Sequence, residues 1–408
     1  MRILFLADGR SPIARSWILG RIEDGHEVHL VSSRAQSEPP IKGLASFHSL
    51  PLIPQPRRAR GQVAATTVTQ RSAASLAVSA IALHWVAPWW IGRQAKRFEN
   101  IVRETRPDLV HALRLPLEGM VALAARGDRT APVPTAVSIW GNDFTLHAPA
   151  SPMMAAWTRR SLRDVDALHA DCERDLILAA RWGFTPARPT LVAPGNGGLR
   201  AEVFHPASPP PDLSLRWGLP ADAAVFVNPR GLRGYARSDT FFKSIPRVVR
   251  EIPNAYFLCV GMAGSRLASH WLRRLRIGEH VRLLPALAPG EMAELFQGAQ
   301  VSLSVTSHDG TPNTLLEAMA CGCFPIAGDL ASLREWIHDG ENGLLVPAGD
   351  EDALANAVIK ASRSSALREH AAHVNARLVA ERGDVQAVCP AIRRFYEDAM
   401  HPPSARRG

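Results

Sequence analysis

Two carboxylates, Asp309 and Glu317, have the spacing in this 408-residue sequence that most directly suggests chemistry. The apolar, β-branched residues 301–306 predict a strand, and the polar residues after them predict a loop that contains Asp309. Residues 312–321 predict a helix that contains Glu317, and residues 324–327 predict a second strand. The two carboxylates are therefore expected on a loop and on the helix that follows it.

The start of this helix is expected to bind an anion. Thr311 is predicted to cap the helix, with Pro312 at its first position, and Gly322 is predicted to be the left-handed residue after its end. A helix N-terminus that follows a strand of a parallel sheet presents unpaired N–H groups and positive partial charge, which suit a phosphate. Asn313 and Thr314 lie at the same place and are expected to contact the same phosphate.

Glu317 is expected one turn inside the helix, between the apolar residues Leu316 and Ala318. A carboxylate in such surroundings needs hydrogen-bond donors, and two adjacent hydroxyls of a ribose would supply two charge-assisted bonds. Asp309 would then meet another part of the same ligand. The predicted ligand is a diphosphate with a sugar at either end.

This block resembles the signature of the family 4 glycosyltransferases, two-domain enzymes of the GT-B fold in which two glutamates separated by seven residues bind a nucleotide-sugar donor. The resemblance implies that Glu317 binds the donor ribose and that the residue at 309 meets the transferred sugar. Asp309 stands where the family has glutamate, which moves the carboxylate back by one methylene and leaves the donor sugar open. The alternative interpretation is an ordinary α/β unit with a solvated acidic loop.

An arginine follows the strand that is predicted over residues 224–229. Arg230 lies at the carboxyl end of this strand, where open α/β sheets bind ligands. It matches the family's arginine on the donor diphosphate, and its planar fork suits that role. The lysine that the family usually supplies shortly afterwards is absent, so we predict Arg233 as its substitute and Arg237 as the second choice. Solvated loop cations are the alternative for both.

Further residues complete the predicted donor site. Gly310 belongs to the loop before the helix, and Gly261 ends the strand predicted over residues 254–260. In the family, the loop after the next strand packs on the nucleobase, which points to Leu287, although a core position explains an apolar residue there equally well. The resemblance implies transfer with retention and without a metal or another cofactor. Catalytic roles are predicted for Asp309 and the arginines at 230 and 233.

The first half of the sequence is expected to hold the acceptor. Residues 1–33 predict a strand, a turn, a helix and a second strand, and they lack the GxGxxG pattern of dinucleotide-binding proteins. In the family, the turn after the first strand faces the interdomain cleft. The resemblance therefore places Gly9, Ser11 and Arg15 on the acceptor side.

Two later segments supply other acceptor-side candidates. Residues 106–113 resemble the family segment that ends in a histidine, so His111 is either an acceptor contact or a core histidine. The next segment resembles one that often carries a histidine near the reacting sugar, and Trp140 stands at the place of that histidine. Asp143 and His147 are the alternatives for the same contact.

The composition indicates a globular protein with anionic partners. Apolar residues make up 46% and charged residues 21% of the chain, and the net charge of +9 comes mostly from arginine. No nucleic-acid-binding motif accompanies this charge, so we expect no nucleic acid as a partner. The five scattered cysteines are expected to be reduced, mostly buried thiols without a zinc site. Asp164 and Asp166 match a metal-binding aspartate motif, which we interpret as accidental because the segment reads as a helix that ends before a strand.

Residues 72–92 form the most apolar segment, with three tryptophans and His84 as its only titratable residue. A buried or groove-lining helix, a helix on a membrane surface and a membrane span are the three interpretations. The arginines shortly before this segment, at 57, 58, 60 and 71, favour a lipid-linked acceptor. The expected localisation is cytoplasmic, with a peripheral position on the inner face of the membrane as an extension of it.

The alternation of strands and helices predicts an α/β protein with two doubly wound, Rossmann-like domains that face each other across a cleft. The domains are predicted over residues 1–205 and 206–383, with a helix over 384–400 that returns to the first domain and a disordered tail over 401–408. The predicted function is a bacterial glycosyltransferase of polysaccharide or glycolipid synthesis that moves a sugar from a UDP- or GDP-sugar to a hydroxyl of a glycan, lipid-linked or small-molecule acceptor. A non-catalytic nucleotide-sugar scaffold and a nucleotide-sugar epimerase are the alternatives, and the linkage and the oligomeric state stay open.

Overall fold

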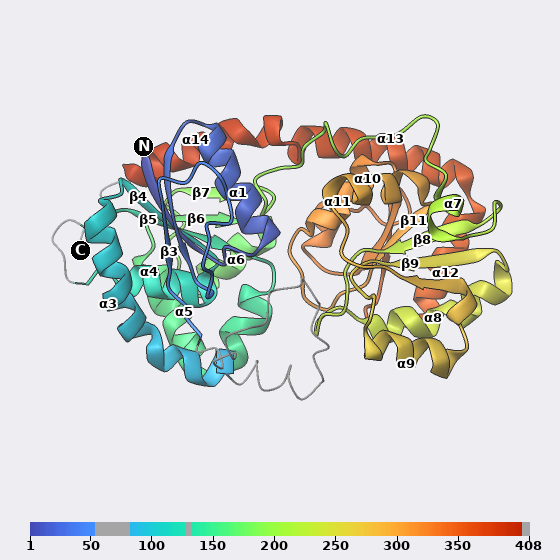
Figure 1. The fold of residues 1–408 in the computed structure, drawn as a ribbon, viewed down its shortest axis with the longest axis horizontal. Helices are drawn as coiled ribbons and strands as arrows, with labels where there is room; N and C mark the ends of the chain where they lie inside the picture. The colour runs from blue at the N-terminus through green and yellow to red at the C-terminus, as the bar shows by residue number, and fades with distance from the viewer. Residues whose placement is uncertain (54–81, 128–131, 402–408) are drawn as a thin grey trace. The chain divides into compact units, whose positions relative to one another are not determined.

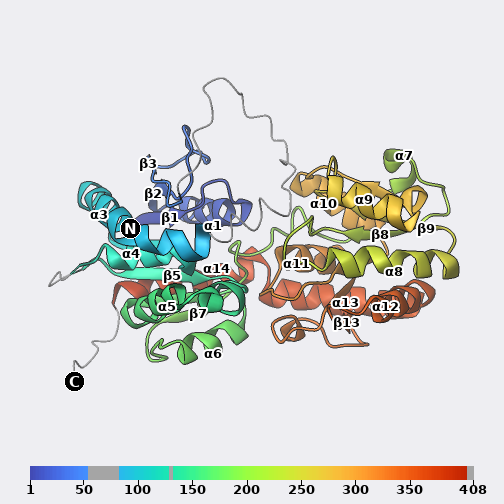
Figure 2. The same cartoon turned by 90° about the horizontal axis from the view of Figure 1, so that it is seen from below.

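The computed structural model describes residues 1–53, 82–127 and 132–401, which form two compact units. The first unit contains the described residues up to Gly198 and those from Val388 onwards, and the second contains Leu199–Ala387. Each unit is a parallel β-sheet with helices on both faces (Figure 1 and Figure 2). The predicted architecture of two Rossmann-like domains is confirmed for each unit by its strand order.

The sheet of the first unit has seven strands in the order β3-β2-β1-β4-β5-β6-β7, and every neighbouring pair is parallel. Its strands are β1 (Arg2–Ala7), β2 (Glu27–Ser32), β3 (Ser46–Ser49), β4 (Leu109–Leu113), β5 (Thr135–Ile139), β6 (Ala167–Ala170) and β7 (Thr190–Val192). The first three predicted elements are confirmed, because α1 (Pro12–Glu23) connects β1 to β2. Ser11 starts α1 by accepting a hydrogen bond from the Ala14 N–H.

The helices of the first unit divide between the two faces of this sheet. Along β1, Ile3 and Phe5 pack with α1 and α14 (Val385–Met400), whereas Leu4 and Leu6 pack with the helices on the other face. This alternation follows from the two-residue period of a strand. The other helices and helical turns are η1 (Ala82–Val86), α3 (Ala87–Thr105), η2 (Leu115–Gly119), α4 (Met120–Ala124), η3 (Asp143–His147), η4 (Ala148–Ala150), α5 (Pro152–Asp164) and α6 (Glu173–Arg181).

The second unit has a six-stranded parallel sheet in the order β10-β9-β8-β11-β12-β13. Its strands are β8 (Ala224–Asn228), β9 (Ala255–Cys259), β10 (Val281–Leu283), β11 (Val301–Ser304), β12 (Phe324–Gly328) and β13 (Leu344–Val346). Its helices are α7 (Leu213–Trp217), α8 (Ser238–Glu251), α9 (Arg266–Leu275), η5 (Gly278–His280), α10 (Pro289–Gly298), α11 (Asn313–Ala320), η6 (Leu333–Glu335), α12 (Glu351–Arg363) and α13 (Ser365–Arg382). Val225 and Val227 pack on the side of α10 and α11, and Phe226 packs on the side of α8 and α12.

The last helix of the described chain completes the core of the first unit. Ile392, Phe395 and Tyr396 of α14 belong to the same hydrophobic cluster as Phe5 and Trp17. The Tyr396 hydroxyl accepts a hydrogen bond from the Trp17 Nε1–H at 2.8 Å. Residues from opposite ends of the sequence therefore share one core.

The same tyrosine begins a chain of buried hydrogen bonds on the face of the sheet that packs against α1 and α14. Its hydroxyl lies 2.7 Å from His111 Nδ1, and His111 Nε2 lies 3.0 Å from Ser138 Oγ. Ser138 Oγ also lies 2.8 Å from Nδ1 of His169, whose Nε2 donates to the Ala193 carbonyl at 3.0 Å. Burial lowers the pKa of His111 well below its ordinary value and that of His169 to about 4, so both rings are neutral at pH 7.

The chain enters the second unit earlier than the proline-rich segment suggested, and it returns to the first unit later than predicted. The units change between residues 198 and 199 and again between 387 and 388, whereas the sequence pointed to 205/206 and to 384. Leu199 belongs to the second unit because it packs in that unit's core and forms a bridge with Asp384. Short backbone pairing, which composition does not reveal, fixes this position.

Parts of three predictions lie outside the described residues. These are the first part of the apolar segment, 72–81, the arginines at 57, 58, 60 and 71, and the tail from 402 onwards. Among the described residues, no helix combines the length and the apolar character that crossing a membrane requires.

Candidate active site

The strand order of each sheet points to the place where a ligand binds. In the first unit the order reverses between β1 and β4, and in the second it reverses between β8 and β11. Open α/β sheets bind ligands outside the carboxyl ends of the strands at such a reversal. In the second unit, Arg230 follows β8 and Asp309 follows β11, so two of the predicted catalytic residues lie at this point.

Arg230 and Asp309 form an ion pair in the second unit. Arg230 Nη2 lies 2.5 Å from Asp309 Oδ2, and the two side chains are only 10% and 14% exposed. Arg230 Nη1 also donates to Thr314 Oγ1 at 3.4 Å, and the backbone N–H of Arg230 donates to Asn228 Oδ1 at 3.1 Å. Within the described residues, the buried Nε of Arg230 has no hydrogen-bond partner. The guanidinium thus connects both loops and the start of α11.

The loop before α11 is held by a segment that follows β12. The Ser332 hydroxyl donates to the Asp309 carbonyl at 2.8 Å, and the Trp336 Nε1–H donates to Thr311 Oγ1 at 3.0 Å. Neither Ser332 nor Trp336 was among the predicted site residues. They fix the backbone on either side of Gly310.

The predicted cap of α11 is wrong by one residue. The helix begins at Asn313, and Pro312 occupies the cap position with an extended backbone (φ −68°, ψ 129°). No side chain caps the helix, because the Thr311 hydroxyl accepts the hydrogen bond from Trp336 instead. The end of the helix is as predicted, since Gly322 has a φ of +80°. The uncapped N-terminus is a suitable position for an anion.

Glu317 lies on α11 as predicted, one turn beyond Asn313. Its neighbours Leu316 and Ala318 are buried. Burial raises the pKa of Glu317 to about 7, although the positive charge of Arg230 opposes this rise. Among the described residues, none donates a hydrogen bond to this carboxylate. A ligand with two hydroxyls would supply the missing donors.

Comparison with known proteins decides the family. Residues 9–195 match the glycosyl transferase 4-like domain, and residues 225–364 match the family described as glycosyl transferases group 1. Together these two regions span well over half of the chain. The chain belongs to the family 4 glycosyltransferases.

This glycosyltransferase resembles bacterial relatives at low identity. It is 26% identical to the D-inositol 3-phosphate glycosyltransferase of Streptomyces bingchenggensis over 72% of this chain and 62% of the relative. It is 27% identical to the phosphatidyl-myo-inositol mannosyltransferase of Mycobacterium leprae over 70% of this chain and 82% of the relative. Anabaena HepE, solved in complex with UDP-glucose, shares the fold with a TM-score of 0.69 at 17% identity, over 97% of this chain and 99% of HepE. The two sheets are therefore the two Rossmann-like domains of the GT-B fold.

Two arginines compete for the role of the second diphosphate cation in this glycosyltransferase. Arg233 is exposed, and its Nη1 donates to the Tyr235 hydroxyl at 2.9 Å. Arg237 forms a bidentate ion pair with Asp239 at 2.9 and 2.8 Å. Arg237 is thus held by a carboxylate, and Arg233 stays the better candidate.

The two other predicted donor positions, Gly261 and Leu287, lie in the loops that follow the neighbouring strands β9 and β10. Gly261 follows β9 with a φ of +72°, and Gly231, next to Arg230, has a φ of +62°. A Cβ on Gly261 would lie at an ordinary contact distance, 3.8 Å, from the Gly231 Cα, so the left-handed backbone rather than a lack of space favours glycine at these positions. Leu287 is partly buried against the core of the second unit, as its alternative interpretation proposed.

The predicted acceptor-side residues of the first unit are mostly bound within the protein. His111 has no exposed surface, and both of its ring nitrogens are hydrogen-bonded, as expected for a core histidine. Asp143 is also buried, where it pairs with Arg114 Nε at 2.9 Å and accepts the Trp140 N–H at 3.1 Å. Burial raises the pKa of Asp143, and the charge of Arg114 opposes the rise.

The remaining acceptor-side candidates are His147 and Trp140. His147 is buried, and its Nδ1 lies 2.9 Å from Nε2 of His84. Of these candidates, Trp140 alone is partly exposed, with Arg114 over its ring at 5.8 Å.

The turn after β1 is covered by the loop that follows β2. Gly9 is buried, and a Cβ at this position would lie 2.8 Å from Gln36 Oε1. Ser11 caps α1, and Arg15 Nη2 donates to the Pro40 carbonyl at 2.7 Å. Gly9, Ser11 and Arg15 therefore have structural partners in the protein, and their acceptor roles remain a prediction.

Sequence reasoning missed a carboxylate at the strand reversal of the first unit. Glu118 lies just after β4, and its Oε1 accepts a hydrogen bond from Ser33 Oγ at 2.6 Å. The backbone before it has two non-glycine residues with positive φ, Arg114 (+133°) and Leu117 (+71°). Such backbone strain concentrates at functional sites. In the sequence, the polar end of the segment after β4 was the signal that could have pointed to Glu118.

Replacing Glu118 with glutamine should stabilise the protein at pH 8 and not at pH 5. Burial raises the pKa of Glu118 to about 7, although the hydrogen bond from Ser33 opposes this rise. The folded state therefore holds the proton that the unfolded state loses near pH 4.5, and the free energy of unfolding falls as the pH rises from about 4.5 to 7. In urea unfolding at pH 8, we expect the free energy of unfolding of the variant to exceed that of the native protein by about 1–2 kcal/mol. The full effect is reduced because the Glu118 side chain is partly exposed to solvent.

A matched control for this measurement is Glu279→Gln, at an exposed position of η5. This variant should leave the difference between pH 5 and pH 8 unchanged. A Glu118→Gln variant whose unfolding free energy runs parallel to that of the native protein at both pH values would contradict the assignment.

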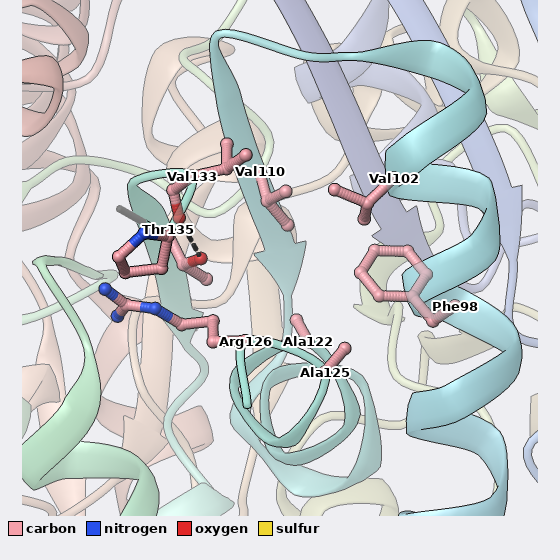
Figure 3. Close-up of a pocket in the computed structure, with 9 residues that line it drawn as sticks. Phe98, Val102, Val110, Ala122, Ala125, Arg126, Val133 and Thr135 are labelled. Carbon is pink, nitrogen blue, oxygen red and sulfur yellow. Dashed lines mark hydrogen bonds between the residues drawn. The ribbon is translucent and has the colours of Figure 1, made fainter. Parts of the chain in front are cut away.

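Other polar groups near the first sheet have structural roles. A cavity of about 20 Å³ lies between α3, α4 and β5 and is too small for a sugar. Phe98 and Val102 are among the residues that line it (Figure 3). Arg126 on its edge pairs with Asp166 at 3.0 Å, and the Thr135 N–H donates to the same carboxylate. Asp166 is therefore held by protein groups.

The described residues bring one group of metal-ligand atoms together, in Asp171, Cys172 and Asp175, within 4.8 Å of one another. Arg174 pairs with Asp175 at 2.7 Å and donates to the Gly141 carbonyl at 2.7 Å. The positive charge of Arg174 thus balances this acidic group, and the cluster supports the turn after β5. All five cysteines are free thiols, and all except Cys389 are buried.

Proposed function

We propose that this glycosyltransferase moves a sugar from a UDP- or GDP-sugar to a hydroxyl of a glycan, lipid-linked or small-molecule acceptor, with retention and without a metal. The supporting observation is the arrangement at the strand reversal of the second unit. Arg230 joins Asp309 to the start of α11, whose N-terminus has no side-chain cap, and Glu317 lies one turn farther along. In this order, Asp309 is suited to the transferred sugar, Arg230 and the start of α11 to the diphosphate, and Glu317 to the ribose of a nucleoside diphosphate sugar.

The proposed mechanism relies on preorganised positive charge. The donor diphosphate lies against Arg230 and the N-terminal N–H groups of α11, which stabilise the negative charge that grows on it as the glycosidic bond breaks. Arg233 adds a second cation from the loop after β8. Glu317 accepts hydrogen bonds from the ribose hydroxyls, and Asp309 accepts one from the transferred sugar. Fixed guanidinium charge thus replaces the metal in this proposal.

The first unit is proposed to bind the acceptor through Trp140 and the segments after β1 and β4. The names of two similar proteins support the substrate classes. The M. leprae relative is a phosphatidyl-myo-inositol mannosyltransferase, and HepE was solved with UDP-glucose. Polysaccharide or glycolipid synthesis is the proposed setting.

A donor-binding scaffold is the second candidate, because Asp309 replaces the glutamate of the family pattern. A panel of nucleoside diphosphates and their sugars, with and without magnesium, separates these ideas in two steps. Stabilisation by one base, independent of magnesium, is expected, since binding to the folded state raises the melting temperature. Transfer from that donor then supports the enzyme, binding without hydrolysis or transfer supports the scaffold, and isomerisation without an acceptor supports an epimerase.

Replacing Asp309 with glutamate should change the choice of donor sugar. The added methylene moves the carboxylate toward the transferred sugar, and a one-methylene change at a specificity site alters discrimination by about tenfold or more. The measurement compares kcat/KM for several sugars on the same nucleotide. Asp309→Asn is the control, since it keeps the length and removes the charge that pairs with Arg230. Unchanged ratios in the glutamate variant would remove Asp309 from the sugar site.

A further inference from the structure

Three tryptophans lie exposed on η1 and the first turn of α3. The exposed fractions of their side chains are 56% for Trp85, 75% for Trp89 and 37% for Trp90. A folded protein seldom leaves several large apolar side chains together in water, and such groups mark interaction sites. The packing of the first unit does not account for their exposure.

Three cations follow the tryptophans on the same side of α3. Arg93, Lys96 and Arg97 are exposed, and the Arg93 guanidinium lies over the Trp90 ring at 5.7 Å from its centre. Residues 85–97 contain no acidic residue. Because residues four apart share a helix face, Trp89, Arg93 and Arg97 form one row.

The opposite side of α3 is fixed in the core. Ile91, Ala95 and Phe98 are buried in the hydrophobic cluster of the first unit. The helix therefore cannot rotate to hide its tryptophans without losing these contacts. The aromatic and cationic side chains form a rigid outward face, which we term the α3 surface: Trp85, Trp89, Trp90, Arg93, Lys96 and Arg97.

We propose that the α3 surface docks on an anionic lipid bilayer. Tryptophan favours the interface between lipid and water, where its ring is half apolar and half polar. Arginine and lysine beside such aromatic residues reach the negative headgroups, as in helices that lie on a membrane. The charge of the surface fits a uniformly negative partner, and its aromatic end fits a partner that admits rings. This inference is independent of the proposed transfer reaction, because docking needs no nucleotide.

The test is cosedimentation of the full chain with vesicles, in the absence of nucleotide. We expect binding to vesicles that contain phosphatidylglycerol, weaker binding to pure phosphatidylcholine, and a loss of the difference at high salt. Trp85→Ala/Trp89→Ala/Trp90→Ala should reduce binding to both vesicle types. Arg93→Gln/Lys96→Gln/Arg97→Gln should weaken binding to anionic vesicles by about 100-fold, since each cation near the surface contributes several-fold.

The matched control removes three exposed cations elsewhere. Arg266→Gln/Arg273→Gln/Arg274→Gln, on α9 of the second unit, changes the net charge equally and should retain binding. Equal loss in both charge variants, or no preference for anionic vesicles, would overturn the proposal. Light scattering without lipid gives the remaining test, because a native oligomer that the tryptophan variant dissociates would assign the surface to a second copy of the chain. The melting temperature of each variant verifies that it is folded.

Discussion

Replacing Glu317 with glutamine is expected to weaken donor binding about 100-fold at pH 8. The ionised carboxylate would accept two hydrogen bonds from ribose hydroxyls, and bonds to a charged group contribute about 1.5–3 kcal/mol each. Glutamine offers one neutral acceptor oxygen in place of two charged ones, so the charge assistance of both hydrogen bonds is lost. The measurement is the Kd of the nucleoside diphosphate sugar that gives the largest thermal shift, by calorimetry.

The pH dependence of the same Kd gives a sharper result. Burial raises the pKa of Glu317 in the unliganded protein to about 7. Since the ribose is expected to bind the ionised form, Kd should be constant above pH 7 and should rise about tenfold for each pH unit below it. Glu317→Gln should abolish this dependence, and the exposed Glu279→Gln should retain it. A native Kd that does not vary between pH 6 and 8 would sink the ribose assignment.

Arg230→Ala is expected to lower kcat by about 100- to 1,000-fold, the usual effect of removing one preorganised donor from a developing negative charge. The guanidinium pairs with Asp309 and reaches Thr314, so its loss also releases the loop that bears the acid. Arg230→Lys should recover only part of the rate, because an ammonium keeps the charge and loses the planar fork. The measurement is kcat together with the donor Kd.

Two further variants separate the causes of this loss. Arg274→Ala, on the exposed side of α9, should leave kcat unchanged and controls for net charge. If the double variant Arg230→Ala/Asp309→Asn has a kcat near that of Arg230→Ala alone, the unpaired Asp309 carboxylate contributes little to the loss of kcat. A variant at 230 that raises Kd and leaves kcat intact would restrict Arg230 to ground-state binding.

The sequence was sufficient to predict the elements of residues 301–328 because local signals agree there. The run at 301–306, the proline and the glycine define a strand, a loop and a helix, and these became β11 and α11. Arg230 and Asp309 are far apart in the sequence, yet they follow β8 and β11. Adjacent parallel strands bring their carboxyl ends together. Topology thus placed two residues side by side that spacing alone could not connect.

The sequence could not settle the role of a side chain whose partner lies far away in the chain. Thr311 is of a residue type that caps helices, but its hydroxyl instead accepts a hydrogen bond from the indole N–H of Trp336. For His111 the sequence left an acceptor contact and a core position open, and the core position depends on Tyr396, which lies 285 residues later in the chain. No local pattern contains such partners, and burial alone would not have named them.

The return of α14 to the first unit has a consequence for the order in which the protein is made. Trp17 and His111 leave the ribosome long before Tyr396, and until then the indole N–H and the imidazole lack their buried partner. Buried polar groups without partners are costly, so the first unit can complete its core only after the whole second unit has been synthesised. The half of the chain that is translated first is therefore the half that folds to completion last.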